Sequence, residues 1–404
     1  MHILLIHQAF VALDEPGGTR HHEIARYLAS QGHQVTIIAS PISYLTGKAR
    51  STKIPWSEKQ TDGDLITILR AYTYPSLHRS FAFRLISFFS FMVSSFFIGL
   101  SVKNVDLVWG TSPPIFQGVT SWALARIKRI PFLFEVRDLW PAFAVAVGVL
   151  RSPLLIKLSE WLESFLYHRA DRIVVNSPGY IPHVKRQGVR QVELVPNGTD
   201  TVMFNPNVDG TAFRQLHGLN AKFVALYAGA HGLSNDLSTM LGAAKKLLPR
   251  NDIILVLLGD GKDKPALQAQ AAQEGLVNIL FLPPIPKVEM PSALAAADAC
   301  IAILKPVEIY KTTYPNKVFD YMASGKPVIL AIDGVIREVI ENACGGVPVR
   351  PGDPDALTQA VLFLADDPEL ANRMGHQGRI YAEMHFDRIT LASRLQEIML
   401  GMVA

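Results

Sequence analysis

Residues 310–327 read YKTTYPNKVFDYMASGKP, and this stretch decides how the second half of the chain folds. A polar loop leads into a short helix that begins near Pro315, since proline suits the first position of a helix. Gly325 ends the helix, and an apolar strand follows at Pro327–Ala331. A loop, a helix, a glycine stop and a buried strand in this order are typical of a parallel α/β sheet.

Lys317 and Asp320 lie three residues apart in the expected helix, so their side chains should share one helix face. A cation and a carboxylate beside a helix N-terminus suit a nucleoside diphosphate. The lysine can meet a phosphate, and the aspartate can accept hydrogen bonds from two ribose hydroxyls. The alternative is an ordinary ion pair on the surface.

Short apolar runs recur along the whole chain and alternate with helical patterns. The other expected strands are Ile3–Ile6, Gln34–Ala39, Asp106–Trp109, Phe132–Val136, Arg172–Val175, Phe223–Tyr227, Ile253–Leu258, Ile279–Leu282 and Ala299–Leu304. The alternation predicts parallel sheets with helices on both faces, and a turn-rich stretch at 193–198 divides them into two doubly wound units. Ligands bind such sheets at the carboxyl ends of the strands, so two facing units would hold a ligand in a cleft.

Composition agrees with two domains, because 404 residues with 49% hydrophobic and 18% charged side chains can build two cores and are not typical of disorder. The net charge of +4 is too small to indicate nucleic-acid binding, but it suits anionic lipid or diphosphate ligands. Cys300 and Cys344 lie well apart, which favours a reducing compartment. The first residues, Met1 to Leu4, lack the charged lead of a signal peptide and indicate a first strand.

Glycine-containing loops follow three of the expected strands. Their members are Gly17 and Gly18, then Gly229, His231 and Gly232, then Gly259 and Asp260. Glycine lets the backbone approach a phosphate closely, and a following helix adds positive potential. A plain turn would explain each loop about as well.

Arg137 and Asp138 follow the strand Phe132–Val136 directly. A charged pair at the carboxyl end of a buried strand is well placed for a functional site. The alternative is a surface salt bridge.

Residues 85–102 carry no charge and reach the lower length limit for a membrane-spanning helix. Serines recur on one face, at Ser87, Ser90, Ser94 and Ser101, and phenylalanines occupy other faces, at Phe88, Phe89, Phe96 and Phe97. Three interpretations stay open: a buried domain helix, a helix lying on a membrane surface, and a true span. Contact with a membrane surface would extend over Phe81–Leu100. Basic side chains would add electrostatic attraction to anionic lipid, and the candidates are Arg79, Arg84, Arg126, Lys128 and Arg129.

The Gly17-Gly18 loop, the segment Pro196-Asn197-Gly198-Thr199-Asp200 and the stretch Asp320–Val328 together resemble glycosyltransferase family 4, and the resemblance covers nearly the whole chain. It implies the α/β GT-B fold, with two facing Rossmann-like doubly wound domains and an interdomain cleft. The acceptor-side domain would comprise residues 1–197, onto which a C-terminal helix at 386–404 crosses back. The nucleotide-sugar-binding domain would comprise residues 198–385.

Two further segments, Arg137-Asp138-Leu139-Trp140-Pro141 and Pro315-Asn316-Lys317, look like the WbuB-like subgroup of bacterial transferases. This resemblance implies a retaining hexosyltransferase without cofactor or metal. It would move an N-acetylated deoxyhexosamine, such as N-acetyl-L-fucosamine, from a UDP-sugar to a polyprenyl-diphosphate-linked glycan in O-antigen, capsule or exopolysaccharide synthesis. The enzyme would be cytoplasmic, bound peripherally to the inner face of the cytoplasmic membrane, and without a nucleic-acid partner.

The resemblance and the residues together give a candidate site. The catalytic candidates are Asp138, expected near the transferred sugar, Arg137 and Lys317. The donor-binding candidates are Gly17, Gly18, Gly229, His231, Gly232, Gly259, Asp260, Thr312, Thr313, Tyr314, Asn316 and Asp320. Within this set the Gly17-Gly18 loop would face the donor diphosphate, and Asp320 would hold the ribose.

The chain departs from the family pattern in two places. Thr312 stands where the first acidic residue of the family's paired motif belongs, eight places before Asp320. The usual arginine and lysine near Gly229–Asp236 are missing. We therefore expect Lys317 to neutralise the diphosphate, with Arg137 or Lys305 contributing.

Two other functions compete with a glycosyltransferase. A UDP-sugar 2-epimerase shares the two-domain architecture, but it needs acid/base carboxylates and histidines around one sugar pocket, and the motifs fit that requirement worse. The second is a non-catalytic scaffold of a glycan-assembly complex, and this alternative stays open because Thr312 replaces an acidic residue of the family motif.

Overall fold

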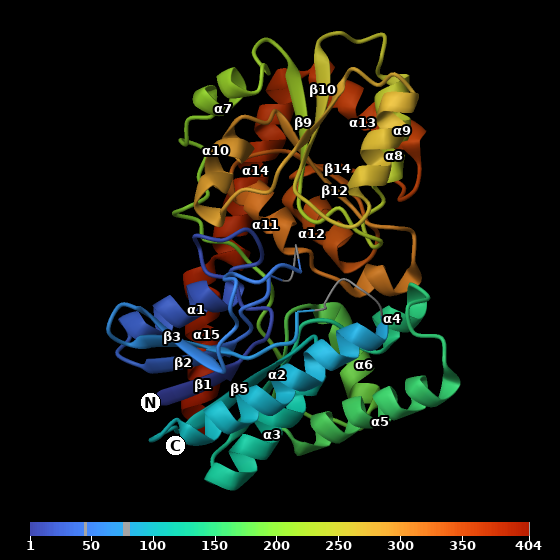
Figure 1. Cartoon of the computed structure of the whole chain (residues 1–404). Helices are drawn as coiled ribbons and strands as arrows, with labels where there is room; N and C mark the ends of the chain where they lie inside the picture. The colour runs from blue at the N-terminus through green and yellow to red at the C-terminus, as the bar shows by residue number, and fades with distance from the viewer. Residues whose placement is uncertain (44–46, 76–80, 404) are drawn as a thin grey trace. The chain divides into compact units, whose positions relative to one another are not determined.

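The computed structural model describes residues 1–43, 47–75 and 81–403, and the chain forms two compact units (Figure 1). Unit 1 comprises Met1–Ala12, Thr19–Pro196 and Ile389–Ala404. Unit 2 comprises Leu13–Gly18 and Asn197–Arg388. Apart from the short segment Leu13–Gly18, the chain passes from unit 1 to unit 2 between Pro196 and Asn197, and it returns after Arg388.

Unit 1 is built on an eight-stranded sheet with the order β3-β4-β2-β1-β5-β6-β7-β8. All neighbouring strands are parallel except β3, which pairs antiparallel with β4 at one edge. The strands are β1 (His2–Ile6), β2 (Gln34–Ala39), β3 (Ser57–Asp62), β4 (Ile66–Ala71), β5 (Leu107–Ser112), β6 (Phe132–Val136), β7 (Arg172–Val175) and β8 (Glu193–Leu194).

The helices of unit 1 follow the strands in the manner of βαβ units. They are α1 (Arg20–Ser30), α2 (Phe81–Ser101), α3 (Phe116–Lys128), α4 (Ala142–Ala146), α5 (Pro153–Arg169), η1 (Pro178–Tyr180), α6 (Ile181–Arg186) and the C-terminal α15 (Arg388–Val403). Leu391, Leu395 and Met399 of α15 are buried in one apolar cluster with Ile3 and Leu5 of β1. The last helix of the chain thus completes the core around the first strand.

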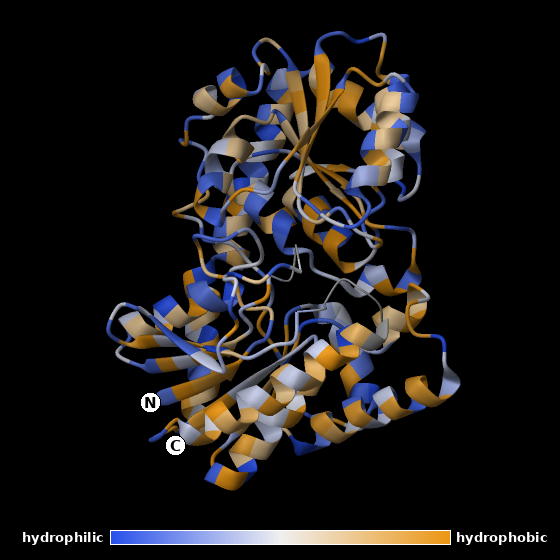
Figure 2. Cartoon of the chain, in the orientation of Figure 1, coloured by the Kyte–Doolittle hydropathy of each residue, from blue (hydrophilic) through white to orange (hydrophobic). Residues whose placement is uncertain are grey.

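Unit 2 contains a six-stranded, fully parallel sheet with the order β11-β10-β9-β12-β13-β14. The strands are β9 (Phe223–Ala228), β10 (Ile253–Leu258), β11 (Ile279–Leu282), β12 (Ala299–Ile303), β13 (Val328–Ala331) and β14 (Gly346–Pro348). The side chains of a strand alternate between faces, so Leu226 and Tyr227 of β9 enter two different apolar clusters. The sheet is covered on both faces, and Figure 2 shows its strands as largely apolar.

The helices of unit 2 are α7 (Thr211–Leu216), α8 (Leu237–Lys246), α9 (Lys264–Gln273), η2 (Lys287–Glu289), α10 (Met290–Ala295), η3 (Glu308–Thr312), α11 (Asn316–Ala323), α12 (Val335–Ala343), α13 (Pro354–Asp366) and α14 (Pro368–Phe386). Helix α11 begins at Asn316, and Pro315 lies one residue before it with extended backbone. The expectation that Pro315 is the first helical residue is therefore off by one. Gly325 follows the helix with φ +67°, as a left-handed stop requires.

The predicted fold class is confirmed, because both units are parallel sheets sandwiched by helices. Several expected strands match to the residue, among them Phe132–Val136, Ile253–Leu258 and Ile279–Leu282. The sequence analysis missed β3, β4, β8 and β14. These are edge strands or their neighbours, and β3 reads SEKQTD with little burial, so it carries no apolar run.

Helix α2 covers the uncharged stretch 85–102 except its last residue, because the helix ends at Ser101. Ser87, Ser94 and Ser95 are buried, and the Ser94 hydroxyl donates to the Tyr72 carbonyl at 2.6 Å. The opposite face is a stripe of exposed apolar side chains: Phe83, Ile86, Phe89, Val93, Phe97 and Leu100. Among the described residues α2 is the helix long and apolar enough to cross a membrane, by length and composition. Its buried serine face shows that it packs as part of unit 1.

Candidate functional site

The loops after β9 and β10 pack backbone against backbone at the carboxyl edge of the unit 2 sheet. The His231 amide donates to the Asp260 carbonyl at 2.8 Å. A Cβ on Gly259, where φ is +146°, would lie 1.9 Å from the Gly229 carbonyl oxygen. A Cβ on Gly261 would lie 2.3 Å from the His231 carbonyl oxygen. These two glycines are therefore required by contact between the loops themselves, and their approach to a phosphate stays a prediction.

Lys317 reaches into the same edge from the first turn of α11. Its Nζ lies 3.9 Å from the centroid of the Tyr227 ring, in a cation–π contact. A Cβ on Gly229 would come within 2.4 Å of this Nζ, so a glycine at that position leaves room for the lysine. No carboxylate pairs with Lys317 within the described part of the chain. Burial lowers the pKa of its amine to about 7.

His231 lies beside Lys317 and is fully buried. Its ring packs against Tyr227 and Phe281, with centroid distances of 5.9 and 6.3 Å. Neither ring nitrogen has a hydrogen-bond partner in the described ranges 1–43, 47–75 and 81–403. Burial, then Lys264 and Lys317, lower the pKa of His231 to about 4, so the ring is neutral at pH 7.

Lys264 binds two backbone carbonyls at the same edge of the sheet, and the sequence analysis did not single it out. Its Nζ donates to the Gly259 carbonyl at 2.7 Å and to the Leu282 carbonyl at 2.8 Å. The ammonium thus ties the end of β10 to the end of β11. The sequence does contain one signal for Lys264, because this lysine lies in the first turn of α9, shortly after a Gly-Asp-Gly loop.

Asp320 is buried, and both of its carboxylate oxygens are engaged within unit 2. Lys287 Nζ lies 2.6 Å from Oδ2, and the Thr199 hydroxyl donates to Oδ1 at 2.9 Å. Lys287 also lies over the Phe204 ring, 4.6 Å from its centroid. Lys317 and Asp320 therefore do not pair with each other. Ribose binding by Asp320 stays a prediction, and it would compete with these two contacts.

The loop before α11 holds the remaining donor-binding candidates. Thr312 ends η3, and its hydroxyl donates to the Ile309 carbonyl at 2.7 Å. The Thr313 amide donates to the Tyr310 carbonyl at 3.1 Å. The Tyr314 carbonyl accepts from the Asn197 side chain at 2.8 Å, and Asn316 Oδ1 lies 3.4 Å from an Arg388 guanidinium nitrogen.

Three other predicted glycines, Gly17, Gly18 and Gly232, are exposed or half-buried. Gly17 and Gly18 are exposed in a loop that belongs to unit 2, and a Cβ on Gly18 would meet nothing within 4 Å. A Cβ on Gly232 would likewise meet nothing within 4 Å. Of the predicted donor-binding set, the structure brings together Gly229, His231, Gly259 and Asp260, and the catalytic candidate Lys317 lies beside them.

A second cluster lies at the carboxyl edge of the unit 1 sheet, around Glu135 of β6. This carboxylate is fully buried and accepts from Arg20 Nε at 3.0 Å and from His21 Nε2 at 2.7 Å. Burial opposes its ionisation, but His21 and Arg20 outweigh burial and hold the pKa of Glu135 well below its usual range. The Arg20 guanidinium also donates to the carbonyls of Val195 and Pro196, the last residues before the chain leaves unit 1.

Arg137 and Asp138 follow β6 directly, as expected, and both are half-buried. Burial raises the pKa of Asp138 to about 6, although Arg137 and a hydrogen bond from Tyr180 act in the opposite direction. A carboxylate with this pKa is ionised at neutral pH and titrates just below it. Such a group can stabilise developing positive charge or orient a sugar hydroxyl.

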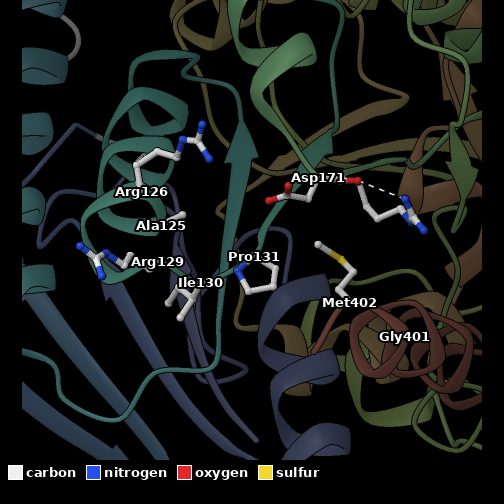
Figure 3. A pocket seen from close by; sticks show the side chains of 9 residues that line it. Ala125, Arg126, Arg129, Ile130, Pro131, Asp171, Gly401 and Met402 are labelled. Carbon is white, nitrogen blue, oxygen red and sulfur yellow. Dashed lines mark hydrogen bonds between the residues drawn. The ribbon is translucent and has the colours of Figure 1, made fainter. Parts of the chain in front are cut away.

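A cavity of unit 1 lies elsewhere. It has a volume of about 660 Å³ and opens between the end of α3, the start of β6 and the end of α15 (Figure 3). Its lining includes Arg126, Arg129, Asp171 and Met402. Because Pro131 precedes β6, this cavity is at the amino edge of the sheet, away from Arg137 and Asp138.

No group of three or more histidine, cysteine or acidic side chains that could hold a metal ion occurs among the described residues. At the carboxyl edge of the unit 2 sheet, Lys317 is a cation that no described carboxylate pairs with.

Two family models match the chain. One, described as "Glycosyl transferase 4-like domain", matches residues 17–198, and the other, "Glycosyl transferases group 1", matches residues 222–367. The chain is a glycosyltransferase of family 4. The transferase is 24% identical to the putative colanic acid biosynthesis glycosyl transferase WcaI of Escherichia coli K12, over 84% of this chain and 86% of the relative.

Solved structures show that the glycosyltransferase has the GT-B fold. Sucrose-phosphate synthase from Thermosynechococcus elongatus superposes with a TM-score of 0.79, at 19% identity, over 98% of each chain. Anabaena HepE in complex with UDP and glucose superposes with a TM-score of 0.73, at 17% identity, over 99% of this chain and 100% of that chain. At such identities the likeness concerns the fold alone.

Proposed function

We propose that this glycosyltransferase is a retaining, metal-independent hexosyltransferase that takes its sugar from a UDP-sugar held at the carboxyl edge of the unit 2 sheet. The observation that carries the proposal is the state of Lys317. Its ammonium lies on the Tyr227 ring without a carboxylate partner, beside a buried histidine and two glycine loops. A diphosphate supplies the missing counter-charge.

Lysine substitutes here for the arginine and lysine that family members carry after the first strand of this domain. The leaving diphosphate gains negative charge as the glycosidic bond breaks, and a preorganised cation in a buried setting stabilises that charge. The short helix α11 adds partial positive charge at its first turn, next to Lys317. Three of the structural neighbours are HepE in complex with UDP or UDP-glucose, which supports a uridine donor.

We further propose that the acceptor is a polyprenyl-diphosphate-linked glycan reached at a membrane surface. The exposed stripe of α2 supports this, and α5 adds a second apolar face that the sequence analysis missed: Leu154, Leu155, Leu158 and Trp161. Both helices pack on α3, so they belong to one layer of unit 1. Exposed apolar patches of this extent mark an interaction surface.

Of the basic residues expected to bind anionic lipid, Lys128 has a different role in the structure. Lys128 donates to the carbonyls of Leu100 and Val102, at 3.2 and 2.7 Å, and so caps the end of α2. Arg126 and Arg129 are exposed and available to anionic lipid. Arg84 is half-buried in α2, and Arg79 lies outside the described residues.

Incubation of the purified protein with a panel of UDP- and GDP-sugars and a polyprenyl-diphosphate-linked saccharide tests the proposal, with product detected by mass spectrometry. We expect release of UDP only when the acceptor is present, an N-acetylated deoxyhexosamine on the product, retention of the anomeric configuration, and unchanged turnover in EDTA. Release of GDP would overturn the donor assignment. A loss of turnover in EDTA that Mg²⁺ or Mn²⁺ restores would overturn metal independence.

A further inference from the structure

His7 stands directly after β1 and is fully buried at the carboxyl edge of the unit 1 sheet. Its Nε2 lies 3.0 Å from a guanidinium nitrogen of Arg137. A guanidinium has donors and no acceptor, so the imidazole nitrogen must accept in this contact. The contact therefore requires a neutral His7 with its proton on Nδ1.

The surroundings of His7 select that tautomer. Its Nδ1 lies 3.4 Å from the Thr111 hydroxyl oxygen, which also accepts from the Gln117 amide at 2.8 Å. Because Gln117 supplies one donor to this hydroxyl, the oxygen has a lone pair left for the Nδ1–H of His7. Gln117 is itself fixed, since its side-chain oxygen accepts from the Gln8 backbone amide at 2.6 Å.

Burial and the neighbouring Arg137 guanidinium keep His7 neutral. The His21 ring packs against it with centroids 4.3 Å apart, and His21 donates to Glu135, which also binds Arg20. Burial, then His21 and Arg137, lower the pKa of His7 well below 6.5. Glu135 is engaged by Arg20 and His21, so it does not pair with Arg137.

We propose that His7 is a positioning residue for transfer: it accepts a hydrogen bond from Arg137 and thereby holds that guanidinium in place at the end of β6. The proposal rests on the proposed transfer function and on Arg137 as the catalytic candidate that meets an anionic or oxygen-bearing group of the substrate. A neutral acceptor fixes the guanidinium without cancelling its charge, whereas a carboxylate in the same place would neutralise it. Arg137 keeps its remaining donors for the substrate.

A double-mutant cycle tests this with the UDP-release assay and the donor and acceptor that support wild-type turnover. If His7 acts through Arg137, His7→Ala lowers kcat roughly 10-fold to 100-fold, and His7→Ala adds little to the loss caused by Arg137→Ala. His7→Gln, whose side-chain oxygen can accept from Arg137, should recover most of the activity. His22→Gln is the matched control, because His22 is a buried histidine of the same region that pairs with Asp62 instead.

The outcomes separate this inference from the function on which it rests. Losses that multiply in the double variant, or equal losses for His7→Ala and His7→Gln, would overturn the positioning role and leave the transferase intact. A fall in thermal stability that tracks the fall in kcat across all three His7 and His22 variants would also overturn it. Absence of UDP release by the wild-type protein with every donor would instead overturn the proposed function.

Discussion

At the scale of single residues, the chain places two titratable groups with shifted pKa values at the ends of strands. Lys317 has a pKa near 7 because it is half-buried against an aromatic ring, where desolvation disfavours its charged form. Asp138 has a pKa near 6 because burial outweighs its arginine neighbour. Groups perturbed by burial in this way are strong candidates for functional sites.

Lys317→Ala is expected to reduce turnover by on the order of 10²–10³, because it removes a preorganised cation from the leaving diphosphate. UDP affinity should fall as well, measured by calorimetry. Lys262→Ala is the matched control, since Lys262 is an exposed lysine in a neighbouring loop. Unchanged kinetics and unchanged UDP affinity for Lys317→Ala would refute the role.

The pH dependence of UDP binding follows from the lowered pKa of Lys317. In the free enzyme the amine loses its proton above pH 7, and the bound diphosphate raises the pKa again. Binding should therefore take up protons near pH 8, and affinity should fall as the pH rises above about 7. Calorimetry in buffers of different ionisation enthalpy measures the uptake. Lys317→Arg should lose it, because arginine stays charged.

Asp138→Ala is expected to abolish transfer without changing the thermal unfolding temperature greatly. For the wild type, kcat/KM should fall below pH 6, because the carboxylate protonates there. Asp138→Asn keeps the shape and removes the charge, so it should lack activity at every pH. Wild-type turnover in the alanine variant would show that the side chain is only structural.

At the scale of elements, α2 has two faces with different partners. Ser87, Ser94 and Ser95 are buried in unit 1, whereas Ser101 at the end of the helix is exposed. The phenylalanines of α2 include one that is fully buried, Phe91, and three that are exposed: Phe83 at 38%, Phe89 at 45% and Phe97 at 56%. Sequence periodicity predicted the small face and the outward phenylalanines. It did not predict the exposed face of α5, because the apolar residues of α5 are interrupted by Lys157 and Glu160.

Replacing Phe89 and Phe97 together by serine is expected to weaken flotation with anionic vesicles. Burying one such side chain is worth about 1.5–3 kcal/mol, so each replacement should cost roughly tenfold or more in binding. Val277→Ser in unit 2 is the control, since Val277 is 88% exposed and lies on neither helix. Equal flotation of the double variant and the wild type at low salt would exclude α2 as the contact.

At the scale of the whole molecule, the two ends of the chain meet in one core. Leu395 of α15 is fully buried in the cluster that also contains Ile3 and Leu5 of β1. Unit 1 is therefore complete only when the last residues of the chain have been added.

Leu395→Ala is expected to lower the free energy of unfolding by about 2–5 kcal/mol, through lost apolar contact and a cavity. Leu400→Ala is the matched control on the same helix, where the side chain is 44% exposed, and it should change the free energy little. Urea denaturation of both variants measures the difference. Equal effects of the two substitutions would contradict the packing of α15 in unit 1.

The sequence by itself determined the fold class, the positions of the central strands and the two glycine-containing loops that follow β9 and β10 in unit 2. Apolar runs and their spacing are local properties, so Ile253–Leu258 could be located without knowing its neighbours. The placement of Arg137 and Asp138 after a strand was local in the same sense.

Only the tertiary structure decided which partner each charged side chain has. Asp320 and Lys317 lie three residues apart, but Asp320 pairs with Lys287, and Lys317 lies on Tyr227. His7 meets Arg137, 130 positions away, and Glu135 meets Arg20, 115 positions away. Helical spacing says which residues share a face, whereas burial and ion pairing depend on strands brought together from distant parts of the chain, which no local pattern records.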